Sequence, residues 1–195
     1  MRLRRVCVFC GSNTGNHPAY RAAAEQLGAL LAERGIELVY GGGNIGLMGV
    51  LADSVLARGG RVIGVIPDFM LAKEVGHNGL TELRIVGSMH ERKAVMSDLS
   101  DGFIALPGGF GTFEEFCEVV TWSQLGLQSK PCGLLNVESY YAPLLELFDN
   151  AVREGFLRVE NRRLVLDDED PARLLEKMAE FKAEPVEKWI GREER

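Results

Sequence analysis

The stretch Leu106-Pro107-Gly108-Gly109-Phe110-Gly111-Thr112-Phe113-Glu114-Glu115 decides how this chain folds. An apolar run, 102–106, leads into it and is typical of a buried strand, and a run with helical periodicity follows it to about Leu125. Three glycines within four residues join the two runs, and glycine lets a backbone turn tightly and approach a ligand closely. Free N–H groups at the start of a helix suit an anion. Because Glu114 and Glu115 follow at once, the stretch predicts a phosphate site beside carboxylates.

The same alternation of strand and helix continues along nearly the whole chain. Apolar runs predict strands at residues 6–10, 36–40, 61–66, 81–86, 102–106, 132–136 and 162–166. Periodic runs with capping residues predict helices at residues 18–34, 47–58, 88–99, 112–125, 139–154 and 170–181. The pattern predicts an α/β fold, a single Rossmann-like, doubly wound parallel sheet with helices on both faces. We expect one nucleotide-binding domain over residues 1–195, in which 182–195 form a fraying tail.

Composition narrows the class of protein. The chain has 195 residues, of which 46% are hydrophobic, so we expect a globular protein with a sizeable core. The net charge of −6 argues against nucleic acid or an acidic membrane as partner, although a local basic pocket for one phosphate stays open. The apolar run after Met1-Arg2-Leu3-Arg4-Arg5 is too short for a signal peptide, and no run is long enough to span a membrane. We expect a cytoplasmic protein.

The cysteines and histidines do not predict a metal centre. Cys7 and Cys10 form a C-x-x-C pattern, but in a strand residues three apart point to opposite faces, so buried free thiols are the better interpretation. The three histidines are dispersed, and no Cys/His cluster or Asp-rich loop is present in the sequence. We therefore expect no cofactor.

A second glycine-rich segment, Gly41-Gly42-Gly43-Asn44-Ile45-Gly46, matches the G-x-G-x-x-G pattern of dinucleotide sites. It follows the second predicted strand rather than the first, and the nearest acidic candidate, Asp68, comes after Pro67. A mononucleotide site is therefore favoured over a dinucleotide site. A tight strand–helix turn with no ligand is the competing interpretation.

Arg92 lies on the apolar row of a predicted helix, together with Met89, Met96 and Leu99. A guanidinium that points toward buried surface requires an anion. For most buried arginines, that anion is the partner in an internal salt bridge. For an arginine at a functional site, it is a ligand phosphate or a catalytic carboxylate.

Glu115 also has two interpretations. Thr112-Phe113-Glu114-Glu115 reads as T-x-x-E, a helix capping box that contributes roughly 1 kcal/mol. The functional alternative is a carboxylate at the phosphate site.

Four segments together carry a family resemblance. Pro107 to Glu115 fits the PGGxGTxxE pattern of the "Lonely guy" (LOG) family, cytokinin-activating phosphoribohydrolases whose relatives often carry a lysine-decarboxylase label. The segment Tyr40 to Gly49 resembles a glycine-rich segment of that family, and Cys10-Gly11-Ser12 resembles its first turn. The Arg92-Lys93 pair stands at the family's spacing from the motif glutamate, and the resemblance covers roughly residues 5–180.

The resemblance implies a set of site residues. Glu115 and Arg92 would be catalytic, which favours the functional interpretation of both. Implied substrate contacts are Ser12, Gly42, Gly43, Glu74, Met89, Lys93, Gly109, Phe110, Gly111, Thr112, Phe113, Glu114 and Thr121. For Glu74 and Thr121 the resemblance is the sole basis, because a solvated surface glutamate and a half-buried helix threonine are their ordinary roles.

The implied activity is hydrolysis of the N-glycosidic bond of adenosine 5′-monophosphates, including N6-modified cytokinin nucleotides such as N6-isopentenyl-AMP. The products would be the free base and ribose 5-phosphate. The resemblance also implies a homodimer. Two alternatives stay open: a non-catalytic carrier of a nucleotide or of the molybdenum cofactor, and an NAD-type oxidoreductase built on Gly41 to Gly46.

Overall fold

The computed structural model describes residues 2–71, 76–77 and 79–182. Its strands form one parallel sheet of seven strands in the order β4-β3-β2-β1-β5-β6-β7. The strands are β1 (Arg5–Phe9), β2 (Glu37–Tyr40), β3 (Val62–Pro67), β4 (Glu82–Val86), β5 (Gly102–Ala105), β6 (Cys132–Leu135) and β7 (Val165–Asp168). The predicted fold class is confirmed.

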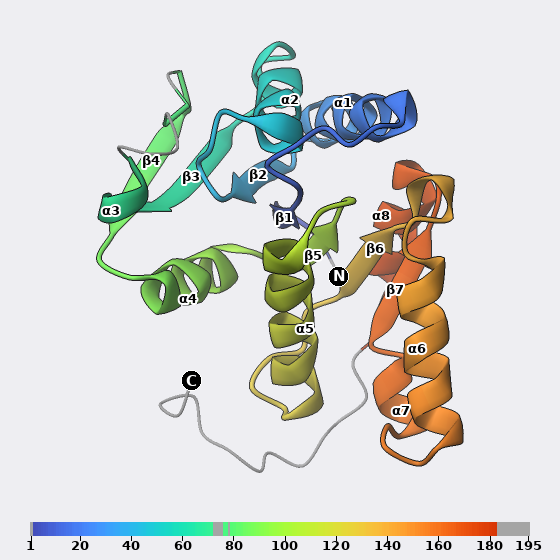
Figure 1. Cartoon of the computed structure of the whole chain (residues 1–195). Helices are drawn as coiled ribbons and strands as arrows, with labels where there is room; N and C mark the ends of the chain where they lie inside the picture. The colour runs from blue at the N-terminus through green and yellow to red at the C-terminus, as the bar shows by residue number, and fades with distance from the viewer. Residues whose placement is uncertain (1, 72–75, 78, 183–195) are drawn as a thin grey trace.

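Helices cover both faces of this sheet (Figure 1). They are α1 (Pro18–Glu33), α2 (Gly46–Leu56), α3 (Asp68–Leu71), α4 (Met89–Leu99), α5 (Phe110–Gln124), α6 (Ala142–Arg153), α7 (Val159–Arg162) and α8 (Pro171–Glu180), with a short 3-10 turn at Val137–Ser139. One hydrophobic cluster joins α1, α2 and α8 to the sheet, and a second joins α4, α5 and α6 to the opposite face.

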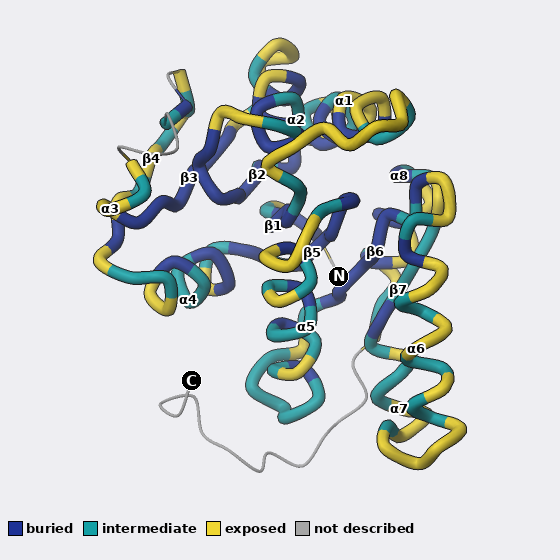
Figure 2. The backbone as a smooth tube through the Cα atoms, viewed as in Figure 1, coloured by how far each residue is buried: buried dark blue, intermediate teal, exposed yellow. Residues whose placement is uncertain are grey.

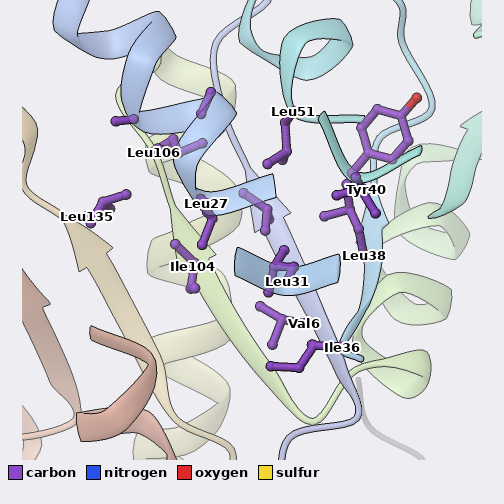
Figure 3. Packing of buried hydrophobic residues seen from close by; sticks show 14 of the residues in the cluster. Val6, Leu27, Leu31, Ile36, Leu38, Tyr40, Leu51, Ile104, Leu106 and Leu135 are labelled. Atoms are coloured by element: carbon purple, nitrogen blue, oxygen red, sulfur yellow. The ribbon is translucent and has the colours of Figure 1, made fainter. Parts of the chain in front are cut away.

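The central strands are buried on both sides because their side chains feed these two clusters alternately (Figure 2). Val6 and Val8 belong to the first cluster, where Figure 3 shows Val6 beside Leu31 and Ile36. Cys7 belongs to the second cluster, whereas Cys10 packs against the first. The C-x-x-C thiols therefore lie on opposite faces and are free, as predicted.

The chain first builds the sheet from β1 outward through β2, β3 and β4, and then returns to place β5 on the other side of β1. The order of the strands therefore reverses between β1 and β5. Ligands in open α/β sheets bind at such a point, at the carboxyl ends of the strands. The turns that begin at Cys10 and Leu106 follow these two strands.

Three predicted element boundaries are wrong. Helix α5 begins at Phe110, two residues before the predicted start, so Thr112 and Glu115 lie inside the helix and the predicted capping box does not form. Ser139 does not cap α6; it lies in the 3-10 turn that precedes this helix. The last strand covers Val165–Asp168 rather than 162–166, because residues 159–162 form a short helix.

Two predicted caps are confirmed. The Ser88 hydroxyl accepts the N–H of Glu91 at 3.1 Å, and the Glu91 carboxylate accepts the N–H of Gly87 at 2.7 Å. At α8, the Asp170 carboxylate accepts the N–H of Arg173 at 2.9 Å. Each cap fixes the start of a helix through donors that the helix itself leaves unpaired.

Candidate active site

A cavity of about 340 Å³ opens where the turns after β1 and β5 meet α4 and α5. Its lining comes from segments far apart in the sequence: Cys10, Gly11, Ser12, Met48, Met70, Met89, Arg92, Gly109, Phe110, Gly111, Thr112, Glu114 and Glu115. The predicted contacts Ser12, Met89, Arg92, Glu115 and residues 109–112 and 114 are therefore brought together around one space.

Glu115 reaches this cavity from the second turn of α5. Its side chain is 13% exposed. Burial raises the pKa of this carboxyl to about 7, while the nearby positive charge of Arg92 acts to lower it. A carboxyl that titrates near neutral pH can exchange protons with a substrate or a water molecule.

Arg92 lies opposite Glu115, on α4. Its residue exposure is 7%, which confirms that the guanidinium points toward buried surface. Nε donates to the carbonyl of Val65 at 3.1 Å and Nη2 to the carbonyl of Gly41 at 3.3 Å, while Nη1 lies 3.8 Å from Oε1 of Glu115. The carbonyls fix the plane of the guanidinium, and the third nitrogen faces the carboxylate.

The position of Arg92 explains why residue 41 is a glycine. A Cβ atom built on Gly41 would lie 2.0 Å from Nη2 of Arg92, so any side chain there would expel the guanidinium. Gly42 has a φ of +78°, and Gly46, with a φ of +61°, lies against the backbone of Ser12. Among the described residues that line the cavity, neither Gly42 nor Gly43 is found. The second glycine segment is thus a tight turn that admits Arg92.

The start of α5 supplies the predicted anion-binding groups. Gly109 is the N-cap and has no side chain to cap with, and the first helical bond runs from the N–H of Phe113 to the carbonyl of Gly109 at 3.1 Å. The N–H groups of residues 110–112 precede that bond, so the helix leaves them free to bind a ligand. Gly108 allows the close packing of this turn, since a Cβ there would lie 2.1 Å from the Thr112 hydroxyl.

Lys93, next to Arg92, does not line the cavity described by the structure. Its ammonium donates to Glu114 at 2.6 Å and to Glu118 at 2.9 Å, and its side chain is 11% exposed. These bonds tie α4, which carries Arg92, to α5, which carries Glu115.

The remaining predicted contacts lie elsewhere. Phe113 packs against Tyr140 and Tyr141 rather than into the cavity. Thr121 is exposed, donates to the carbonyl of Cys117, and lines a different pocket with Phe156. Glu74 lies outside the described residues, as do 183–195 of the predicted tail.

Sequence reasoning did not single out Met48 or Met70, which add apolar surface to the cavity. Met48 could have been found, because it belongs to the glycine-rich segment that carries the resemblance. Met70 follows β3 in the short helix α3, and no pattern in the sequence distinguishes it.

Neither a metal-binding cluster nor a membrane-spanning helix is found among the described residues. Groups of three or more His, Cys, Asp or Glu side chains that could hold a metal ion are absent from that part of the chain. No helix among those residues combines the length and the apolar character needed to cross a membrane.

Comparisons with known proteins identify relatives of this chain. A family model described as "Possible lysine decarboxylase" matches residues 48–178. A probable cytokinin riboside 5′-monophosphate phosphoribohydrolase of Oryza sativa subsp. japonica is 52% identical over 92% of this chain and 81% of its own length. The cytokinin riboside 5′-monophosphate phosphoribohydrolase LOG of the same plant is 50% identical over 92% of this chain and 74% of its own length.

Solved structures share the fold at lower identity. The molybdenum cofactor binding protein of Rippkaea orientalis superposes with a TM-score of 0.69 over 92% of this chain and 98% of its own, at 24% identity. At that identity the likeness shows the fold alone, whereas the sequence relatives show the family. The chain belongs to the LOG family of cytokinin riboside 5′-monophosphate phosphoribohydrolases.

Proposed function

We propose that this protein hydrolyses the N-glycosidic bond of adenosine 5′-monophosphates and releases the free base and ribose 5-phosphate. One observation carries the proposal: a largely buried carboxyl whose pKa is about 7, Glu115, lies 3.8 Å from the buried guanidinium of Arg92 in the same cavity as a free helix N-terminus. Anion recognition and a proton-exchanging group therefore share one space.

The proposed mechanism follows from the charge that develops on the ribose during hydrolysis. As the bond between the ribose and the base breaks, positive charge develops on the sugar. The Glu115 carboxylate stabilises that charge and accepts a proton from the attacking water. The water oxygen becomes the new hydroxyl of ribose 5-phosphate, and the bonding electrons leave with the base, which takes up a proton. Arg92 orients the nucleotide and balances the negative charges around Glu115.

The N–H groups of residues 109–112 hold the 5′-phosphate in this proposal, with Ser12 beside them. The thioether side chains of Met48, Met70 and Met89 offer adaptable apolar surface for a base. The curated relatives are named for cytokinin riboside 5′-monophosphates, and we extend that substrate class, N6-modified adenine nucleotides, to this chain.

We propose a homodimer as the working form. Its support is an apolar surface over α5, α6 and α7, where Phe156 is 90% exposed and Leu147 is 60% exposed. Thr121 lines the pocket on this surface together with Phe156. In a dimer that packs through this surface, Thr121 of one subunit contacts substrate in the site of the other subunit.

We also propose that the protein works in the cytoplasm. The support for this proposal is that Cys7, Cys10, Cys117 and Cys132 are all free in the structure. Free cysteines are typical of proteins in a reducing compartment.

The deciding experiment is chromatographic. The purified chain is incubated with AMP and with N6-isopentenyl-AMP, beside Glu115→Gln and, as a matched control, Glu25→Gln on the exposed face of α1. We expect free base from the wild type and from the control, and its loss in Glu115→Gln. Tight nucleotide binding without release of base would instead favour the carrier interpretation.

A further inference from the structure

We infer that Tyr140 and Tyr141 are positioning residues, which hold the loop 106–109 so that the N–H groups of residues 109–112 face the 5′-phosphate. The inference rests on the proposed function and deepens it. Both tyrosines lie more than 30 residues beyond the loop in the sequence, and neither lines the active-site cavity among its described residues.

The carbonyl groups of the loop are tied one after another. The Tyr141 hydroxyl donates to the carbonyl of Leu106 at 2.7 Å, and the Tyr140 hydroxyl donates to the carbonyl of Gly108 at 2.5 Å. Between them, the N–H of Gly11 donates to the carbonyl of Pro107 at 3.1 Å. The next carbonyl, that of Gly109, accepts the first bond of α5.

These bonds orient the amide groups as well. In a trans peptide unit the carbonyl and the following N–H point in opposite directions, and the described chain has no cis peptide bond. With the Gly108 carbonyl held by Tyr140, the N–H of Gly109 points away from that side chain. Gly108 and Gly109 both lack the Cβ that restricts φ and ψ. The peptide unit between them can therefore rotate unless a hydrogen bond fixes its orientation.

The backbone before the tyrosines supports the inference. Glu138 and Ser139 adopt left-handed φ values of 52° and 57°, which are costly for residues with a side chain. The strained pair turns the chain so that both following residues, Tyr140 and Tyr141, reach the loop, and the Asn136 side chain accepts the N–H of Tyr141 at 2.7 Å.

The same aromatic cluster contains a matched control. Tyr20 meets Tyr140 edge-on at 5.8 Å between ring centroids, but among the described residues the side-chain hydroxyls that donate to the loop are those of Tyr140 and Tyr141. A change from tyrosine to phenylalanine keeps the ring packing at all three positions and removes one hydroxyl each time.

The experiment measures binding of AMP and adenosine, which differ only in the 5′-phosphate, by calorimetry in a Glu115→Gln background that prevents turnover. We expect Tyr140→Phe and Tyr141→Phe to raise the Kd for AMP roughly threefold to tenfold, the effect of one hydrogen bond, with the Kd for adenosine unchanged. Tyr20→Phe should leave both values unchanged.

Several results would overturn the inference. They are an AMP Kd within twofold of the parent in both variants, equal weakening of AMP and adenosine, an equal effect of Tyr20→Phe, or a parent that binds AMP no tighter than adenosine. Failure of the proposed function looks different. In that case the wild-type chain releases no base, and the AMP-to-adenosine comparison still decides the role of the tyrosines.

Discussion

At the scale of single residues, Glu115 controls how the reaction depends on pH. Its pKa is about 7 because burial disfavours the carboxylate, and the proposed mechanism needs the carboxylate form. We therefore expect kcat/KM to fall as the pH drops below 7 and to level off above about pH 8. Initial rates with AMP between pH 5 and 9 test this, and a flat profile across that range would exclude Glu115 as the ionising group.

The same burial makes ionised Glu115 a cost to stability. A carboxyl whose pKa is higher in the folded state stabilises the fold below its unfolded pKa of 4.5, and this contribution is lost as the pH rises through about 7. Glu115→Gln removes the titration. Relative to wild type, the variant should gain free energy of unfolding between pH 4 and pH 8, on the order of 3 kcal/mol. Urea titrations at both pH values measure the gain, and a constant difference would contradict it.

Gly41 sets the position of Arg92. Since a Cβ at this position would lie 2.0 Å from Nη2, Gly41→Ala must displace the guanidinium. A displacement of about 1 Å in a catalytic group lowers the rate roughly 100-fold, and we expect a loss of this size in kcat/KM. Gly87→Ala is the control, because a Cβ there meets only the Glu91 carboxylate, at 3.4 Å. Comparable activity in the two variants would disprove the role of Gly41.

At the scale of elements, the contact between α4 and α5 keeps Arg92 and Glu115 opposed. Lys93 bridges Glu114 and Glu118 from a side chain that is 11% exposed, so Lys93→Met leaves two carboxylates facing each other. We expect a loss of about 1–2 kcal/mol in the free energy of unfolding, with lower kcat/KM.

The control for this element contact is Arg21→Met. Arg21 pairs with Glu25 on the exposed face of α1, and its side chain is 60% exposed. A pair of that kind contributes at most about 1 kcal/mol. Equal losses in the two variants would show that Lys93 has no special role in joining α4 to α5.

The elements themselves were predictable because their signals are local. The alternation of apolar runs and glycine turns predicts the parallel sheet, and the caps at Ser88 and Asp170 depend on residues within one turn. The start of α5 was not predictable, because Thr112 and Glu115 imitate a capping box while the true N-cap, Gly109, carries no side chain. Two contacts at the site also escaped prediction, because 51 residues separate Arg92 from Gly41 and 32 separate Tyr140 from Gly108.

At the scale of the whole molecule, the apolar surface on α6 and α7 predicts the assembly. Helix α6 has an apolar side but contains no buried residue, and Phe156 follows it at 90% exposure. Phe156→Asp should convert the proposed dimer into a monomer, because it places a charge in apolar surface that association would bury. Light scattering on the wild type, on this variant and on Ile85→Asp, at an exposed position of the edge strand β4, measures the mass. A monomeric wild type would refute the proposal.

The contact between Arg92 and Gly41 also constrains how this chain can diverge. A lineage that keeps the arginine in this place is expected to keep glycine at position 41, because even the methyl group of alanine would displace Nη2. The two positions are therefore expected to change together. Among descendants of this fold, a side chain at position 41 predicts that this guanidinium has moved or has been lost, whatever its other glycine motifs retain.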